Sequence, residues 1–193
     1  TKNEERHLRD CLESVRDHVD EIVVVDSFST DSTREIAIKF GARFYQQDFK
    51  GFASQRNRCA ELASHEWVLQ LDADESVEPG TWPFLHGLFQ AETPRHAAYA
   101  LPRRSISADG KFHLWVRHYP VFIDRFYDRR RCRYRREYLE YLERDGSRGF
   151  LPHHLLHDRP EPTTEACQEK ADHYSRLRRI TLEQAGPPPG FLR

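Results

Sequence analysis

Residues 22–26, Ile22-Val23-Val24-Val25-Asp26, are a short β-branched run that ends in an acidic residue. The run is too short for a helix, and its continuous apolar character is typical of a strand buried in a parallel sheet. A polar turn over residues 27–32 follows it. We therefore predict a fully buried strand here, with a loop at its carboxyl end.

Helical and extended patterns alternate on both sides of this strand. The predicted helices cover residues 4–18, 32–40, 52–63, 79–91 and 163–185. The other predicted strands cover residues 43–45, 67–71, 98–101 and 111–117. Strands and helices that alternate with short connections indicate an α/β fold, with a mostly parallel sheet flanked by helices.

The composition fits one soluble globular domain. The chain has 193 residues, of which 38% are hydrophobic and 32% charged, and its formal net charge is −1. A charge near zero gives no general attraction to nucleic acid, so we expect no nucleic-acid partner. A local basic stretch, residues 125–136, could hold phosphates or contact an anionic membrane surface, or it could be a solvated hairpin with snorkelling arginines.

The cysteines and the start of the chain bear on its compartment. Four cysteines lie far apart without a CxxC pair, which argues against a zinc site or a disulfide framework and suits a reducing cytosol. The sequence has neither a signal peptide nor an apolar run of 18 residues, so we expect a cytoplasmic protein. Because the chain begins with Thr1 and contains no Met, we also expect that the natural N-terminus is missing, together with the first strand of the sheet.

Acidic residues follow two of the predicted strands. Asp26 ends the first run, and Asp72 and Asp74 follow the strand over 67–71. Ligands of open α/β sheets bind beyond the carboxyl ends of the strands, so both acidic sites should face one crevice. Two carboxylates one residue apart can share Mg²⁺ or Mn²⁺, which adds substrate phosphates as ligands. The structural alternative for each aspartate is that it caps the next helix.

Four segments of the first 75 residues resemble the motifs of family-2 glycosyltransferases. They are residues 1–5, 21–33, 51–57 and the D-x-D element within 71–75. The branch that the chain resembles is the lipopolysaccharide-core glucosyltransferase type, with looser similarity at 115–120, 124–126 and 155–157. The resemblance implies a Rossmann-like GT-A fold and a single domain over 1–193. Residues 1–100 would bind the nucleotide sugar, and residues 101–193 would bind the acceptor and end in a helix.

The resemblance also implies roles for the matching positions. Asp26 would contact the base or ribose of the nucleotide, with Asn3 and Glu4 near the same pocket. Asp72 would lie near the ribose and diphosphate, and Arg56 near the diphosphate, where a guanidinium suits phosphate geometry.

The implied cofactor is a divalent metal, Mn²⁺ or Mg²⁺, held by Asp74 and His157. Such a cation neutralises a diphosphate leaving group, which is the main electrostatic task in transferring a sugar from a nucleotide. The alternative for His157 is an ordinary loop or helix-edge histidine, one of 11 in the chain.

An inverting transfer needs a general base that takes the proton of the acceptor hydroxyl. The resemblance places an acidic residue in the second half, and counting back from residues 155–157 gives Glu140. Glu137 and Glu143 compete for the role, and all three glutamates could be a solvated face beside the arginines. Leu139 stands where the family has histidine.

Phe28 and Ser32 stand where the family usually has glycine. If these positions need positive φ, a side chain there costs on the order of 1 kcal/mol or more. These departures, with Leu139, leave open a non-catalytic GT-A-like module that only binds the nucleotide sugar. A nucleotidyltransferase is a further alternative.

The favoured function is a metal-dependent inverting glycosyltransferase. We expect it to move a hexose such as glucose from a UDP-sugar to a hydroxyl of a bacterial surface glycan or lipopolysaccharide-core acceptor. Such glycolipid acceptors sit on the inner membrane, so the basic stretch and the C-terminal helix would dock the cytoplasmic enzyme there peripherally.

Overall fold

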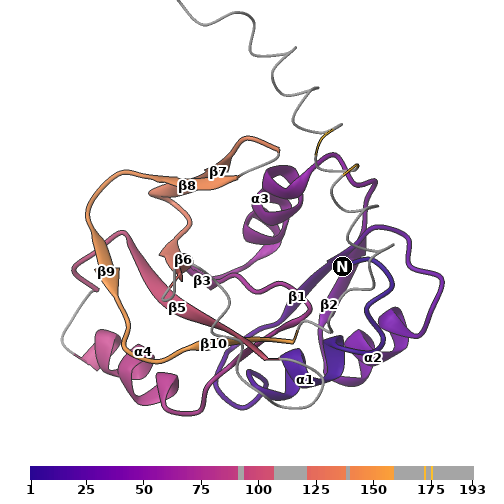
Figure 1. The fold of residues 1–193 in the computed structure, drawn as a ribbon, viewed down its shortest axis with the longest axis horizontal. Helices are drawn as coiled ribbons and strands as arrows, with labels where there is room; N and C mark the ends of the chain where they lie inside the picture. Colours follow the sequence, from indigo (N-terminus) through magenta and orange to yellow (C-terminus); the bar gives the residue numbers. More distant parts are fainter. Residues whose placement is uncertain (91–93, 107–120, 138–139, 159–171, 173–174, 176–193) are drawn as a thin grey trace, which may run out of the picture.

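The computed structural model describes residues 1–90, 94–106, 121–137, 140–158, 172 and 175. Helices and strands alternate in the first half of this part of the chain, and strands dominate the second half (Figure 1). The predicted α/β class is confirmed. The predicted strand over 111–117 lies outside the described residues, as does all but two positions of the predicted helix over 163–185.

The N-terminal part is built on a parallel pair of strands, β1 (Val23–Asp26) and β2 (Arg43–Gln46). The helix α2 (Thr33–Lys39) connects them, as a parallel pair requires. The predicted helix over 4–18 is shorter in the structure, where α1 (Leu8–Glu13) is followed by turns to residue 18. Apolar side chains join both helices to β1, namely Leu8, Leu12, Val24, Ile36 and Ala37.

The larger sheet has the strand order β3-β6-β5-β10-β4, and β9 pairs with β5. Its strands are β3 (Trp67–Leu69), β4 (Glu75–Val77), β5 (Ala98–Ile106), β6 (Val121–Asp128), β9 (Arg148–Phe150) and β10 (Leu155–Asp158). β9 and β10 run parallel to β5, whereas the pairs β3–β6, β5–β6 and β4–β10 are antiparallel. The sheet is therefore mixed rather than mostly parallel. Parallel neighbours need a long crossover such as α2, whereas the antiparallel pairs β3–β6 and β4–β10 join strands that lie far apart in the sequence.

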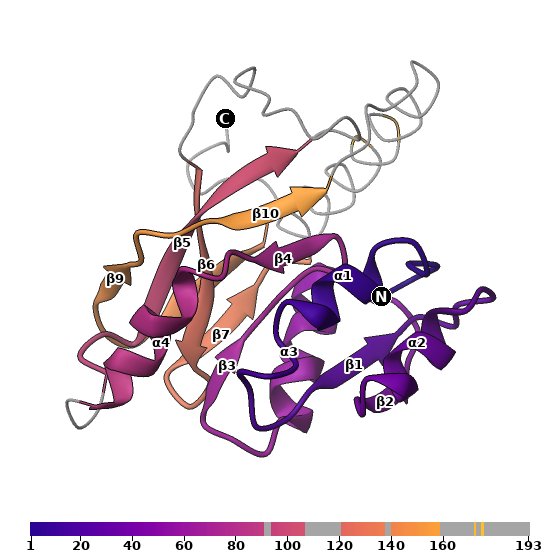
Figure 2. The ribbon, with the colours of Figure 1, turned by 90° about the horizontal axis from the view of Figure 1, so that it is seen from below.

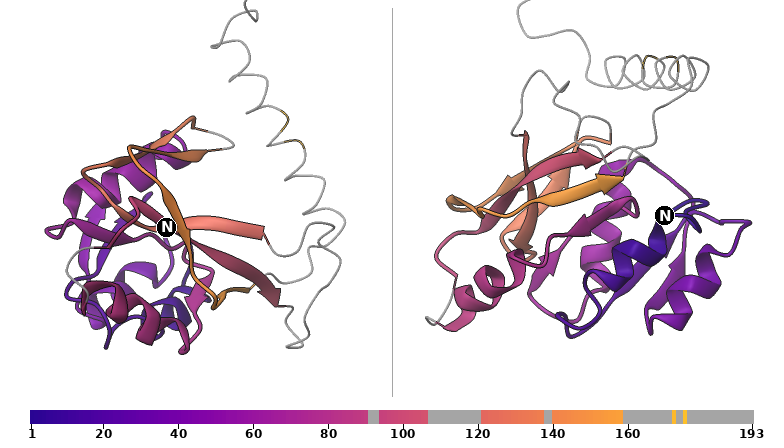
Figure 3. Two further views of the ribbon diagram at one scale, coloured as in Figure 1. Left: turned by 90° about the vertical axis from the view of Figure 1, so that its left-hand side faces the viewer. Right: turned by 60° about the horizontal axis from the view of Figure 1, so that its bottom comes forward.

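Two helices and a hairpin cover this sheet. Figures 1 and 3 show α3 (Phe52–Leu62) and the hairpin of β7 (Cys132–Arg135) and β8 (Tyr141–Arg144) on one side and α4 (Thr81–Gln90) on the other. Trp82 and Leu85 of α4 pack in a core with Tyr99 and Leu155. A second core joins Ala53 and Ala60 of α3 to Tyr127, Tyr134 and Leu142. The two cores fix α3 and α4 against the sheet.

The short strand β4 links the two parts of the fold. It pairs with β10, where Glu75 lies opposite His157, and it contacts α1 (Figure 2). The Asp72-Ala73-Asp74 segment lies between β3 and β4. Consequently the D-x-D element, the first helix and the last described strand meet at one place.

Candidate functional site

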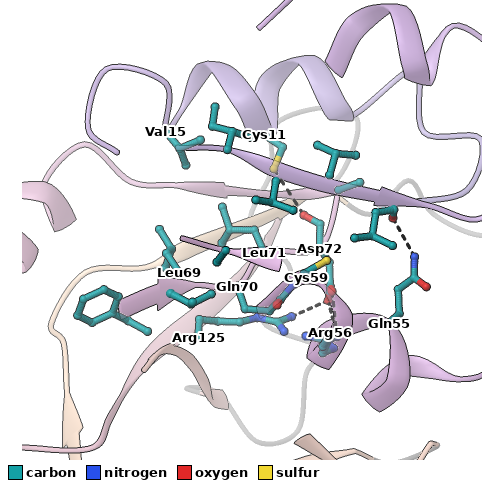
Figure 4. A pocket seen from close by; sticks show the side chains of 18 of the residues that line it. Cys11, Val15, Gln55, Arg56, Cys59, Leu69, Gln70, Leu71, Asp72 and Arg125 are labelled. Carbon is teal, nitrogen blue, oxygen red and sulfur yellow. Dashed lines mark hydrogen bonds and ion pairs between the residues drawn. The ribbon is translucent and has the colours of Figure 1, made fainter. Parts of the chain in front are cut away.

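A cavity of about 1680 Å³ opens between α1, β1, α3 and the residues that follow β3 (Figure 4). Six of the eight site residues expected from the sequence line it: Glu4, Arg56, Asp72, Asp74, Glu140 and His157. They come from positions 4 to 157 of the chain, so the fold brings together side chains that are far apart in sequence. Asn3 and Asp26 do not line the cavity.

Asp72 is held between two arginines (Figure 4). Arg125 Nη2 donates to Asp72 Oδ2 at 2.5 Å, and Arg56 Nη2 lies 2.9 Å from Asp72 Oδ1. Burial opposes the charged form of Arg56, but the neighbouring acidic groups, Asp72 first and then Tyr134, Glu140 and Glu75, together outweigh it and raise the pKa of this guanidinium. The Asp72 side chain is 36% exposed, so one part of its carboxylate faces the cavity while the arginines fix its orientation.

Arg125 and Glu75 form the buried base of this cluster. They are 2% and 1% exposed, and Arg125 Nη2 donates to Glu75 Oε1 at 2.7 Å. Burial and then the neighbouring Asp72 carboxylate raise the pKa of Glu75 above its usual range. No role for Arg125 or Glu75 was expected from the sequence. In β6 the pair Asp124-Arg125 interrupts the apolar residues Phe122-Ile123 and Phe126-Tyr127, but this pattern does not show which charged side chain is buried.

Asp74 and His157 meet at the other side of the D-x-D element. Asp74 Oδ2 lies 3.1 Å from His157 Nε2, and the backbone N–H of Asp158 donates to Asp74 O at 2.9 Å. Burial favours the neutral carboxyl of Asp74, but the hydrogen bond and charge of His157 keep its pKa below the usual range. The pairing of β10 with β4 brings Asp74 and His157 together. Local sequence patterns alone do not reveal this contact, because the two residues lie far apart in the chain.

This pair fits a divalent cation. Two ligand atoms about 2.1 Å from a metal, at right angles, lie roughly 3 Å apart, close to the separation of these two atoms. Within the described ranges, no group of three or more His, Cys, Asp or Glu side chains is arranged to hold a metal. Asp74 and His157 would therefore supply two ligands, and substrate oxygens and water the rest, as is usual for Mg²⁺.

The structure separates the three candidate glutamates. Glu140 Oε1 lies 3.1 Å from Arg56 Nη2 at the cavity. Glu137 Oε2 instead accepts the backbone N–H of Ser54 at 3.0 Å, in the first turn of α3, and Glu143 pairs with Arg135 on the exposed hairpin. Glu140 is thus the one of the three that lines the cavity.

Asp26 and Asn3 stabilise the turn that follows β1. The Asp26 carboxylate is fully buried and accepts hydrogen bonds from Thr1 Oγ1 at 3.0 Å and from the backbone N–H of Ser29 at 2.8 Å. Asn3 Oδ1 accepts the backbone N–H of Thr30 at 2.9 Å. In this structure both side chains shape the loop, and their direct contact with a nucleotide stays a prediction.

The basic stretch is largely neutralised by neighbouring carboxylates. Arg130 pairs with Asp128 at 2.7 Å, Arg133 with Glu61 at 3.4 Å, and Arg135 with Glu143 at 2.6 Å. These ion pairs favour the solvated-hairpin interpretation of the stretch.

The sequence of the chain is similar to a known protein family and to individual known proteins. The family model described as "Glycosyl transferase family 2" matches residues 1–152. An uncharacterized glycosyltransferase of Rickettsia conorii, RC0292, is 34% identical over 102 residues, which cover 52% of this chain and 36% of the relative. The chain thus spans about a third of the length of that relative.

Solved structures show weaker similarity. Staphylococcus aureus TarS 1-349 in complex with UDP-GlcNAc is 22% identical, with a TM-score of 0.49, over 61% of this chain and 36% of that one. Glucosyl-3-phosphoglycerate synthase from Mycobacterium tuberculosis, in complex with Mn²⁺, UDP and glucosyl-3-phosphoglycerate, is 25% identical with a TM-score of 0.43. It covers 57% of this chain and 42% of that one.

Proposed function

The chain belongs to glycosyl transferase family 2, and from this premise we propose that it is an inverting glycosyltransferase that uses a nucleotide-sugar donor and a divalent metal. One observation carries the proposal. Six of the eight residues expected to hold the donor, the metal and the acceptor proton, although distant in sequence, line one cavity. The family membership also argues against the nucleotidyltransferase alternative.

The donor diphosphate would lie between the two clusters at the D-x-D element. Arg56 would pair with the diphosphate, because its fork of N–H donors matches phosphate oxygens. Asp72 is oriented by Arg56 and Arg125. The part of its carboxylate that faces the cavity would accept a hydrogen bond from a ribose hydroxyl. Asn3, Glu4 and Asp26 would shape the neighbouring nucleotide pocket.

Asp74 and His157 would hold the metal. When bound there, Mn²⁺ or Mg²⁺ neutralises charge on the diphosphate leaving group. The 3.1 Å contact between Asp74 Oδ2 and His157 Nε2 keeps the two ligand atoms together before the cation arrives. This arrangement reduces the reorganisation needed on binding.

Glu140 would be the general base. Its carboxylate would take the proton of the acceptor hydroxyl as the oxygen attacks the anomeric carbon and the bond to the diphosphate breaks. Arg56 lies 3.1 Å from Glu140, so one side chain touches both the base and Asp72. We infer that this bridge aligns the base with the donor.

The acceptor and location are extensions of the same proposal. We propose a hexose, such as glucose, as the transferred group and a bacterial surface glycan or lipopolysaccharide core as the acceptor. Residues 1–100 would bind the donor and residues 101–193 the acceptor, within one domain. Within the part of the chain that the structure describes, no helix has the length and apolarity to cross a membrane. Contact with the inner membrane would be peripheral.

Calorimetric titration of UDP and UDP-glucose, with and without Mn²⁺, tests the donor site. We expect micromolar binding in the presence of Mn²⁺, markedly weaker binding without it, and at least a tenfold loss of the Mn²⁺-dependent affinity in Asp74→Ala. Asp17→Ala, at an exposed aspartate outside the cavity, is the matched control and should bind like the wild type. Metal-dependent binding without any turnover of UDP-glucose would favour the binding-only module. Absence of binding by folded wild-type protein would contradict the donor site.

A further inference from the structure

Phe28 has an unusual backbone conformation in the turn after β1. Its φ is +58°, in the left-handed region that glycine adopts freely and that a bulky side chain avoids. The phenyl ring is 50% exposed, so burial in the core does not compensate for the strain. A strained and exposed aromatic residue is an observation from which a functional role can be inferred.

Neighbouring side chains hold the backbone of Phe28 in place. The Asp26 carboxylate accepts the backbone N–H of Ser29 at 2.8 Å, and Ser29 Oγ accepts the backbone N–H of Asn3 at 2.8 Å. Lys2 Nζ donates to the carbonyl oxygen of Phe28. These contacts fix the backbone of the turn from both sides, so the ring projects from a preset position of the chain.

The ring lines the cavity that contains the candidate donor site. Phe28 shares this cavity with Arg56 and Asp72. Among the described residues, no aromatic ring is recorded in contact with Phe28, although Phe49 and Phe52 of the same cavity pack edge to face at 5.2 Å. Phe28 therefore offers an apolar surface to whatever occupies the cavity.

We propose that Phe28 is the stacking platform for the base of the nucleotide donor. This inference rests on the proposed function, because the base is the planar, apolar part of such a donor. The phosphates need charged partners, which Arg56 supplies, and the sugar carries hydroxyls that need hydrogen bonds. A phenyl ring suits the flat face of the base, with which aromatic side chains stack regardless of its identity.

The test compares Phe28→Gly, Phe28→Trp and the control Phe84→Ala by calorimetry in the presence of Mn²⁺. Phe84, on α4, is 47% exposed and lies outside the cavity. The probes are UDP and inorganic pyrophosphate, which lacks the base. Phe28→Gly should weaken UDP binding about 5- to 150-fold, the stacking free energy of about 1–3 kcal/mol converted at 1.4 kcal/mol per tenfold. Its pyrophosphate binding should equal that of the wild type, as should both affinities of Phe84→Ala.

Two further readouts separate stacking from a structural role. Thermal unfolding of Phe28→Gly should occur at or above the wild-type midpoint, because glycine adopts this φ without strain. Phe28→Trp should keep UDP affinity within about threefold of the wild type, since an indole also stacks on a base. Its added fluorescence should be quenched by UDP and not by pyrophosphate.

The outcomes are distinguishable. If the wild type binds UDP and Phe28→Gly binds it equally well, the stacking role is overturned while the donor site stands. If Phe28→Gly does not fold, an indole in Phe28→Trp that saturating UDP leaves unquenched overturns the role. If the folded wild type binds neither UDP nor pyrophosphate, the proposed donor site fails and this inference fails with it.

Discussion

Replacement of Arg125 tests whether the buried charges under Asp72 stabilise the fold. In Arg125→Met the hydrocarbon stem is retained and the guanidinium is lost, which leaves Glu75, 1% exposed, without its contact at 2.7 Å. Removing one partner of a buried ion pair costs about 3–5 kcal/mol. Arg103 Nη1, 3.8 Å from Glu75, remains as a partial substitute, and the pKa of Glu75 is already raised in the wild type, so we expect about 3 kcal/mol or less at neutral pH.

The pH dependence of this loss identifies its cause. The variant can avoid a buried charge by protonating Glu75, and for a carboxyl of ordinary pKa this costs about 3.7 kcal/mol at pH 7 but only about 1 kcal/mol at pH 5. A carboxyl whose pKa is raised by folding destabilises the fold progressively as pH rises above its unfolded pKa. The destabilisation of Arg125→Met should therefore shrink to about 1 kcal/mol or less at pH 5.

Urea unfolding of the wild type and the variant at pH 7 and pH 5 gives both free energies of unfolding. Arg125→Met combined with Glu75→Gln should recover about 0.5–3 kcal/mol relative to the sum of the single variants, because the two side chains are in contact. Arg16→Met, at an exposed ion pair with Asp17, is the control and should change stability by less than about 0.5 kcal/mol. A loss below about 1 kcal/mol at pH 7, or one that is equal at both pH values, would refute this reasoning.

Three further predictions concern single side chains. Glu140→Gln should lower kcat about 10²- to 10⁴-fold, whereas Glu143→Gln, on the exposed hairpin, should leave it unchanged; equal losses would remove Glu140 as the base. Leu155→Ala, fully buried between β5 and β4, should cost about 2–5 kcal/mol in urea unfolding. Hydrogen bonds from Arg130 hold the pKa of Asp128 below its usual range, so its stabilisation is present above the unfolded pKa and is lost as pH falls through the folded one. The difference in Tm between wild type and Asp128→Asn should therefore narrow from pH 6 to pH 3.

The sequence carried enough information for the first half of the fold and less for the second. The β-branched run at 22–25 and the helix at 52–63 have local patterns whose outcome depends little on distant residues, and both appear in the structure as β1 and α3. The mixed order of the larger sheet depends on pairings between strands far apart in sequence, such as β4 with β10. The hydrophobic pattern of a single segment carries no information about such distant pairings. It therefore could not predict the order and direction of the strands in the sheet.

The candidate site divides in the same way. The D-x-D element was visible because both carboxylates lie within one short segment after a strand. Arg125 was not identified, although it contacts Asp72 at 2.5 Å, because an arginine in an arginine-rich stretch gives no sign of which side chain is buried. Only the position of β6 beside β3 turns Arg125 inward and leaves Arg129 and Arg130 at the surface.

The two carboxylates of the D-x-D element have different partners, and this difference bears on which of them would bind a metal. Asp72 contacts two permanently charged guanidiniums, so a divalent cation there would meet Arg56 and Arg125 at close range. Within the described part of the chain, the Asp74 carboxylate is hydrogen-bonded to the imidazole of His157, which can be neutral and can itself ligate. The arginines thus make Asp72 a poor metal ligand and a good anchor for a neutral hydroxyl. A cation that binds Asp74 would displace a hydrogen bond with His157, whereas one that binds Asp72 would have to displace ion pairs with arginines. Asp72→Asn should therefore weaken UDP binding with and without Mn²⁺ by the same factor, whereas Asp74→Asn should abolish only the part that depends on the metal. Loss of metal dependence in Asp72→Asn would reverse the assignment.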